Sequence, residues 1–423
     1  MAAISDDSDA TRLPQELIDA IIFALYSSPD EDSAVRQRTL RACAIAHSSL
    51  LQRCQQYLFR DITLIVPSHR VVDAPIWTPT QKLRDVLTRS PHLAEYVRVL
   101  RIEERLTPVK KLHGEIEWGE PYGAARETGL VQLLHILPEL EHLAFTGHMR
   151  DRVLPTALGQ AFAIPPALHT LELAVVSAPL LLLQEMRLLQ NLQTRSVRWL
   201  TPEISATSHS HERPTIRELE LHQSTLPRWP SIPVGGDAES PIDLSALCSF
   251  SVTMGIDMSP VVHHLIRTCR ATLTKLEVWP TDSPTLPVRD LSPMPVLPLG
   301  ELSNLEELVI RSPTGVTAVN TRSMWNWILA SLSELHARKS PTTLALIIDI
   351  SYHSSHALGT MHFTELDRTL SRISSQLRSV TLRINRSTLL RWITKDDFRA
   401  RLEECFPLVA PLGILWLDVP DPQ

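Results

Sequence analysis

Three histidines close together, His353, His356 and His362, are the most suggestive group of chemically active side chains in this sequence. Histidine is a frequent metal ligand, and spacings of this kind could serve a metal ion. However, no cysteine or further carboxylate completes a ligand set, and with 17 histidines in the chain such a cluster arises by chance. The segment SYHSSHALGTMHF is typical of a polar turn entering a helix. We therefore predict no metal site.

The motifs of nucleophilic and phosphate chemistry are missing from the sequence. It contains no G-x-S-x-G turn to expose a serine nucleophile and no G-x-G-x-x-G or G-x-x-x-x-G-K loop, and its five cysteines form no C-x-x-C pair. His263 and His264 fall in a helical stretch, where structural roles are commoner. Asn385 begins a formal glycosylation sequon, which we interpret as a chance match. The sequence predicts no enzyme activity and no cofactor.

Composition and charge narrow the class of protein. The chain has 423 residues, of which 43% are hydrophobic and 21% charged, as in an ordinary globular protein. Its net charge of −6 argues against a nucleic-acid binder. The longest apolar stretch, near residues 174–183, is about half the length of a membrane span. The N-terminus is acidic, unlike a signal peptide. We expect no membrane partner and an intracellular location, in the cytoplasm or nucleus.

The elements that must carry any function are short and repeated. The chain contains 65 leucines and 32 prolines, and the pattern apolar-x-x-apolar-x-apolar recurs along it. The nine copies lie at Val97/Leu100/Ile102, Leu140/Leu143/Phe145, Leu168/Leu171/Leu173, Ile216/Leu219/Leu221, Leu247/Phe250/Val252, Leu273/Leu276/Val278, Leu305/Leu308/Ile310, Leu377/Val380/Leu382 and Leu412/Leu415/Leu417, with a variant, LALIIDI, at residues 344–350. Helical patterns precede most copies. Short strands alternating with helices predict parallel pairing, because parallel neighbours need a crossover connection.

Repeats of this kind predict an α/β solenoid, in which stacked units bury a continuous ladder of leucines. The LxxLxL units resemble leucine-rich repeats of the longer, irregular type, over residues 93–420. The alternative is a doubly wound α/β sheet, although such folds usually mark their ligand site with a glycine-rich turn. We expect a disordered tail at 1–11, a helical module at 12–66, a connecting strand, helix and linker at 67–92, and the solenoid with a parallel sheet at 93–420.

The N-terminal segment carries apolar residues at helical spacing. We expect one helix over residues 13–25 and a second over residues 39–59, joined by a polar connection at 26–38. The segment resembles an F-box, and the matching residues are Leu13, Pro14, Glu16, Leu17 and Ile21 in the first helix and Leu40 and Cys43 in the second. The resemblance implies that these residues, together with Ile18, contact a partner protein. The family often has a cysteine where His47 stands and a tryptophan where Leu50 stands. A plain helical cap that shields the first repeat is the alternative interpretation.

The resemblance implies a function as well as a fold. An F-box protein with leucine-rich repeats is the substrate-recognition subunit of an SCF-type ubiquitin ligase. Its N-terminal helices bind a SKP-type adaptor, which links to a cullin, and its repeats hold a target protein. The alternative is a non-catalytic leucine-rich scaffold whose degenerate F-box does not bind the adaptor.

The target-binding surface follows from the alternation of side chains along each strand. With the leucines pointing inward, the intervening residues face the concave surface of the solenoid. These residues are Arg101, Glu172, Glu220, Glu277, Trp279, Arg311, Arg383 and Trp416. In this register the tryptophans are exposed, and the three glutamates form an acidic stripe suited to a basic stretch of a target. An ordinary solvated face is the alternative.

Overall fold

The computed structural model describes residues 14–27, 33–67, 78–105, 109–110, 116–117, 128–147, 153–154, 156–200, 213–222, 242–254, 259–280, 295–311, 318–338, 344–352, 363–386 and 394–419. The chain folds into two compact units. The first unit comprises residues 1–148 and 154–172, and the second comprises residues 149–153 and 173–423. Within the described ranges, no helix has the length and hydropathy to cross a bilayer.

The first unit begins with three helices, α1 (Gln15–Ser27), α2 (Ser33–Ala46) and α3 (Ser48–Arg60). The expectation of one helix over residues 39–59 was therefore wrong, and so was the assignment of the whole stretch 26–38 to a connection. The helix is interrupted at His47, whose backbone is extended (φ −155°, ψ 140°). The His47 ring nitrogen accepts a hydrogen bond from the backbone N–H of Ser49 at 3.1 Å. This capping bond starts α3 as a separate helix, because it satisfies one of the N–H groups that a helix start leaves unpaired.

The three helices share a small core of their own. Ile22, Leu40, Cys54 and Tyr57 are buried in it, with further half-buried apolar side chains packed around them. The rings of Tyr26 in α1 and Tyr57 in α3 stack with their centroids 4.5 Å apart. This packing fixes which faces of α1 and α2 remain accessible.

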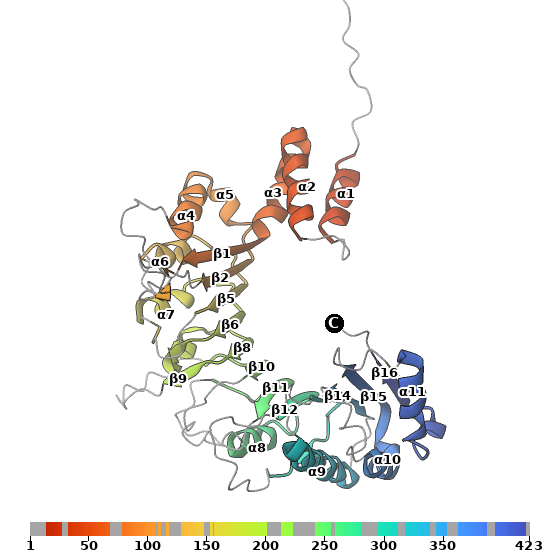
Figure 1. Ribbon diagram of the computed structural model, residues 1–423. Helices are drawn as coiled ribbons and strands as arrows, with labels where there is room; N and C mark the ends of the chain where they lie inside the picture. The colour runs from red at the N-terminus through yellow and green to blue at the C-terminus, as the bar shows by residue number, and fades with distance from the viewer. Residues whose placement is uncertain are drawn as a thin grey trace, which may run out of the picture. The chain divides into compact units, whose positions relative to one another are not determined.

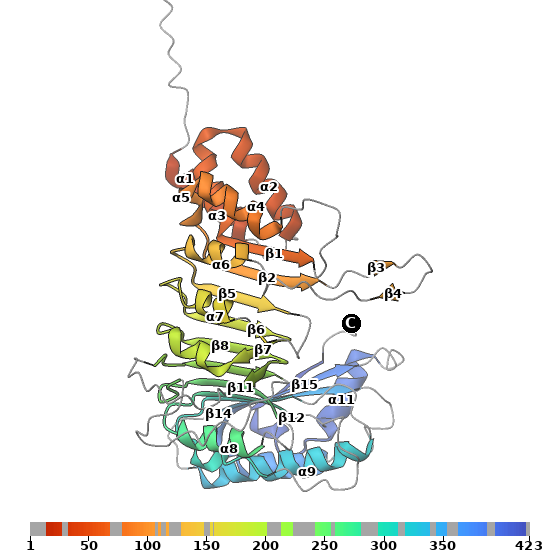
Figure 2. The same ribbon diagram turned by 90° about the vertical axis from the view of Figure 1, so that its left-hand side faces the viewer.

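A parallel sheet follows in the first unit. Its strands are β1 (Asp61–Pro67), β2 (Val99–Arg105), β5 (His142–Thr146) and β6 (Thr170–Ala174), in that order; the boundary between the two units falls within β6. Helices α4 (Pro79–Arg89), α5 (Pro91–Ala94), α6 (Thr128–His135) and α7 (Thr156–Phe162) connect them. Figure 2 shows these strands side by side, with α4, α6 and α7 on one face. A two-stranded antiparallel pair, β3 (Val109–Lys110) and β4 (Ile116–Glu117), lies outside this sheet.

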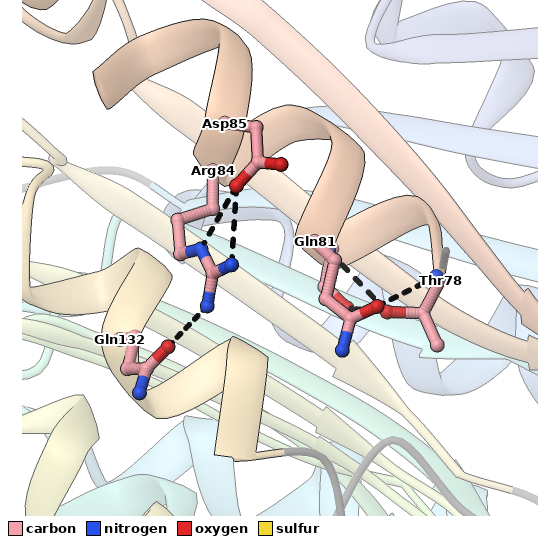
Figure 3. A network of polar contacts seen from close by, with 6 residues as sticks. Thr78, Gln81, Arg84, Asp85 and Gln132 are labelled. Atoms are coloured by element: carbon pink, nitrogen blue, oxygen red, sulfur yellow. Dashed lines mark hydrogen bonds and ion pairs between the residues drawn. The ribbon is translucent and has the colours of Figure 1, made fainter. Parts of the chain in front are cut away.

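Helix α4 is held at its start and along its side (Figure 3). Thr78 and Gln81 form a capping box, in which each side chain accepts the backbone N–H of the other residue. Farther along α4, Arg84 forms an ion pair with Asp85 at 3.1 Å and donates a hydrogen bond to Gln132 of α6. The bond from Arg84 to Gln132 joins α4 to α6. Because these polar groups satisfy one another, we assign the network a structural role.

The second unit continues with one strand for each repeat. Its sheet has the order β8 (Asn191–Arg195), β10 (Glu218–His222), β11 (Ser249–Met254), β12 (Lys275–Pro280), β13 (Glu307–Arg311), β14 (Leu344–Tyr352), β15 (Leu377–Arg386) and β16 (Leu415–Asp418). A separate short pair consists of β7 (Ser177–Pro179) and β9 (Arg198–Leu200). Helices α8 (Ser259–Thr268), α9 (Ala318–Glu334), α10 (Phe363–Arg372) and α11 (Lys395–Glu404) lie on one side of strands β11–β16 (Figure 1). The 3-10 helices are η2 (Leu180–Glu185), η4 (Leu299–Glu301), η5 (Leu335–Ala337), η7 (Ser374–Gln376) and η9 (Ala410–Leu412).

The apolar residues of the repeats form the expected ladder. In the second unit Leu219, Phe250, Leu276, Leu308 and Leu346 are register partners from strand to strand and are fully buried. The parallel pairing and the α/β class are thereby confirmed. The strands of this unit follow one another in sequence order, with no reversal point, which excludes the doubly wound alternative.

The apolar pattern in the sequence did not identify the repeat that contains β8. Strand β8 belongs to a unit in which Leu189 and Leu192 occupy the first two apolar positions and Thr194 occupies the third. Thr194 is buried, and its hydroxyl donates to the carbonyl of Glu220 at 3.3 Å. A threonine can fill this position because the hydrogen bond satisfies its polar group.

Candidate functional site

Two surfaces of the molecule could bind a partner, and the first is on α1. Five exposed residues at the start of α1 and along it have no polar side chain. They are Pro14, which precedes the helix, and Leu17, Ala20, Ile21 and Ala24. Leu17 and Ile21 are each 51% exposed. The spacings of three, four and seven residues place all five on one side of a helix. We call this set the α1 strip. It is a continuous apolar surface on a short helix.

The other side of α1 faces the core of the helical module. Ile18 and Leu40 are buried, and Cys43 packs against the core cluster. The expectation that Ile18 and Leu40 contact a partner directly is corrected here, because these buried side chains stabilise the three-helix packing instead; for the half-buried Cys43 the contact stays a prediction. Glu16 is exposed beside the α1 strip, and Leu13 lies outside the described residues.

The second surface is the face of the sheet opposite the leucine ladder, which we call the polar face. Along β12 the residues alternate between buried and half-buried, with Leu276 and Val278 fully buried and Glu277 and Trp279 half-buried. The alternation agrees with the expected register. Trp279 is less accessible than expected, whereas Trp416 on β16 is 64% exposed.

The centre of the polar face is a network around Arg311. The Arg311 guanidinium contacts Glu277 Oε1 at 2.5 Å and Asp349 Oδ2 at 3.8 Å, and its carbon lies 4.6 Å from the centroid of the Trp279 ring. Trp279 Nε1–H donates to Glu277 Oε1 at 2.7 Å. One cation on β13 is therefore held by a carboxylate and an indole from β12 and by a carboxylate from β14.

Burial shifts the pKa of groups at this network. It raises the pKa of Asp349 above the ordinary value, although the positive charges of Arg311 and Arg383 oppose the shift. Burial also lowers the pKa of His222, whose ring meets that of Trp279 edge to face at 5.3 Å and whose Nδ1 lies 3.0 Å from Thr253 Oγ1. His222 is thus kept neutral at pH 7, and the network depends on Arg311 for its positive charge.

The expected acidic stripe does not stand free on the polar face. Glu277 is bound by Arg311 and Trp279, and Glu220 lies 3.8 Å from His222 Nε2. Glu172 belongs to the first unit, where it lies 2.9 Å from His142 Nε2. Arg311 neutralises Glu277, whereas Glu172 and Glu220 lie beside histidines and remain partly exposed, so the three glutamates do not form a uniform row of free negative charge.

The remaining predicted face residues are also paired within their own units. Arg101 in the first unit forms an ion pair with Asp61 on the neighbouring strand. In the second unit Arg383 contacts Asp418 at 2.9 Å.

Sequence reasoning missed Asp349 as a site residue. Aligning LALIIDI with the other repeats would have found it, because Asp349 then occupies the same position as Arg311 and Arg383.

A metal centre is not part of either surface. Among the described residues, no group of three or more His, Cys, Asp or Glu side chains is placed to hold a metal ion. His353, His356 and His362 lie outside the described residues, as does Ser387 of the sequon. His263 lies in α8, and its Nε2 is 3.2 Å from the carbonyl oxygen of Pro295.

The buried cysteines are not candidates for nucleophilic chemistry. Burial raises the pKa of Cys54 to about 11 and that of Cys269 to about 12, which makes the thiols unreactive.

The pairing of Arg311 leads to a stability prediction. Because burial places the pKa of Asp349 above its ordinary value, the stabilising contribution of this group is largest at low pH and is lost as the pH rises through that pKa. Replacing Arg311 with Met removes the compensating charge and raises the pKa further. We expect Arg311→Met to cost about 1–2 kcal/mol of unfolding free energy at pH 7 and little at pH 3.

Urea unfolding of the wild type and the variant across this pH range measures the effect. Arg399→Met is the matched control, because Arg399 pairs with Glu403 on the exposed surface of α11 and such pairs contribute little. A loss of stability in Arg311→Met that is the same at pH 3 and pH 7 would contradict the role assigned to the two carboxylates.

Comparison with known proteins finds likenesses among solved structures. No protein-family model matches the chain, and no curated protein matches it. Among solved structures, an internalin from Listeria monocytogenes is 14% identical, with coverage of 91% of this chain and 89% of that chain, at a TM-score of 0.31. A likeness this distant carries no argument about function. The description of the fold rests on the strand order and the buried ladder.

Proposed function

We propose that this protein is the substrate-recognition subunit of an SCF-type ubiquitin ligase. In this proposal the helical module binds a SKP-type adaptor, and through it a cullin, while the polar face of the repeats binds a target protein. The chain itself contributes no catalytic group. It acts by holding the target near the ubiquitin-carrying enzyme, which raises the effective concentration of the reacting groups.

The α1 strip is the observation that carries the adaptor part of the proposal. An apolar helix face that remains exposed after the module has formed its own core is the kind of surface that fits a hydrophobic groove of a partner. The strip includes Pro14, Leu17 and Ile21, three of the residues through which the segment resembles an F-box. The adjoining exposed residues, Ala20 and Ala24, are small and allow close approach.

The polar face supports the target part of the proposal. Its tryptophan and arginine side chains are of the types that contribute most to binding energy at interfaces. They stand on strands of one hydrogen-bonded sheet, and the Arg311 contacts hold them in place before any partner arrives. A preorganised surface loses less conformational entropy on binding.

A scaffold that does not bind the adaptor is the second candidate. The observation that favours it is the use of Ile18, Leu40 and Cys43 in the module's own core, which leaves α1 as the main contact. In that case the helical module would only cap the first strands of the sheet.

Co-expression of the full chain with a SKP-type adaptor tests the proposal. We expect the two proteins to purify together in a one-to-one complex that persists through size-exclusion chromatography, with its mass measured by light scattering. A well-folded chain that elutes without the adaptor at micromolar concentrations would contradict the proposal and favour the scaffold.

A further inference from the structure

The polar face carries two ordered rows of side chains across strands β12–β16. The first row is Glu277, Val309, Ile347, Thr381 and Trp416, each in register with the next. After Glu277 this row contains no charged side chain. Its last residue, Trp416, is the most exposed large apolar side chain of the row. The row thus forms a weakly polar floor that ends in an accessible indole.

The second row consists of alternating charges. Arg311, Asp349, Arg383 and Asp418 are register partners on β13–β16, directly beside the first row. Arg311 and Asp349 approach to 3.8 Å, and Arg383 and Asp418 to 2.9 Å. Four charges that alternate along one row sum to zero. Long-range attraction by either sign is therefore weak here, and a charged partner gains little from it.

Arg311 is more accessible than the two carboxylates that contact it. The Arg311 side chain is 35% exposed, whereas the side chains of Glu277 and Asp349 are 13% and 10% exposed. The guanidinium contacts both carboxylates, and the Trp279 ring lies against it. A guanidinium is planar, weakly hydrated and able to stack on aromatic rings. Because two carboxylates already compensate its charge, its accessible part suits a stacking contact better than a new ion pair.

We propose that the polar face of β12–β16 binds an extended target segment that has no net charge and carries two aromatic side chains four or six residues apart. One aromatic ring stacks on the Arg311 guanidinium, and the other packs on the Trp416 indole. This inference rests on the proposed function, since it names the kind of target that the repeats would hold. It replaces the basic target that the sequence alone suggested.

The spacing follows from the sheet. Arg311 on β13 and Trp416 on β16 are separated by three strand intervals, about 14 Å at roughly 4.8 Å per interval, and by two residues along the strands, about 7 Å, which together give about 16 Å. An extended segment that crosses the strands advances about 3.3 Å per residue and turns alternate side chains to the same side. Residues four or six apart therefore face the sheet together, at separations of about 13 Å and about 20 Å that bracket this distance.

Selection of random twelve-residue peptides displayed on phage, with the full-length chain as bait, tests the inference. We expect enrichment of uncharged peptides with two aromatic residues four or six apart. The affinity of a synthetic copy should change less than about twofold between 0.05 and 0.5 M salt, because no long-range charge attraction is involved. Trp416→Ser should weaken this binding at least tenfold.

Leu408→Ser is the matched control, because Leu408 is also an exposed apolar residue but lies outside the strands of the polar face. It should bind the peptide like the wild type. Enrichment of lysine- or arginine-rich peptides whose binding falls with salt, binding that survives Trp416→Ser, or no enrichment over the bare support would each overturn the inference. The selection does not involve the adaptor, so a failure of adaptor binding is recorded separately.

Discussion

Replacing Leu17 and Ile21 together with aspartate should weaken binding to a SKP-type adaptor by on the order of 100-fold or more, while the chain stays folded. Each residue is half exposed on the α1 strip and is available as an apolar anchor. Truncating an anchor of this kind typically costs about 1–3 kcal/mol, and a buried carboxylate without a partner adds to that cost. Isothermal titration of the adaptor against the wild type and the variant measures the loss.

Phe23→Ser provides the matched control for this prediction. Phe23 is 55% exposed on α1 and lies next to Ala20 at one edge of the α1 strip, but about 160° around the helix from the anchor Ile21. We expect its affinity for the adaptor to stay within about threefold of wild type, and thermal unfolding to show that both variants are folded. Adaptor binding that is unchanged in the Leu17/Ile21 variant would show that the α1 strip is not the contact.

Removal of the Asp367 carboxylate should cause the largest loss of stability from a single polar substitution in the last repeats. Asp367 is buried in α10, and its two oxygens accept the backbone N–H groups of Leu408 and Val409 at 3.1 and 3.0 Å. Asp367→Ala leaves the buried N–H of Val409 and the partly buried N–H of Leu408 without their acceptor. We expect the unfolding free energy to fall by about 2–4 kcal/mol, because each orphaned group costs its desolvation.

Hydrogen exchange locates this effect. Amide protection should fall mainly in β15 and β16 and much less in β11 and β12, because repeats interact chiefly with their neighbours. Asp367→Asn keeps one acceptor oxygen and should lose about half as much stability. Arg368→Ala, an exposed neighbour on the same helix, is the control and should change stability by about 0.5 kcal/mol or less. Equal stability of Asp367→Ala and the wild type would contradict the assigned role.

The strands and their buried residues could be predicted from the sequence because that information is local. Side chains alternate along a strand, so a single hexad such as Leu273/Leu276/Val278 already separates the buried residues from the accessible ones. The same reasoning failed for Thr194, where a hydrogen bond across the sheet lets a polar residue take an apolar position. It also failed at His47, where one side-chain cap divides the expected helix into two.

The chemistry of the two surfaces was decided by tertiary structure. The sequence correctly placed Glu277, Trp279 and Arg311 on the polar face, but not their mutual contacts, because these join strands that lie far apart along the chain. Those contacts turn an expected acidic stripe into a balanced network. Likewise, the apolar spacing of α1 identified a helix with excess hydrophobic surface, and only the packing of α1 against α3 and α2 showed that Ile18 is buried while Leu17 and Ile21 remain exposed. Periodicity along the chain determines which residues share a face, whereas the neighbours that cover or pair that face come from elsewhere in the sequence.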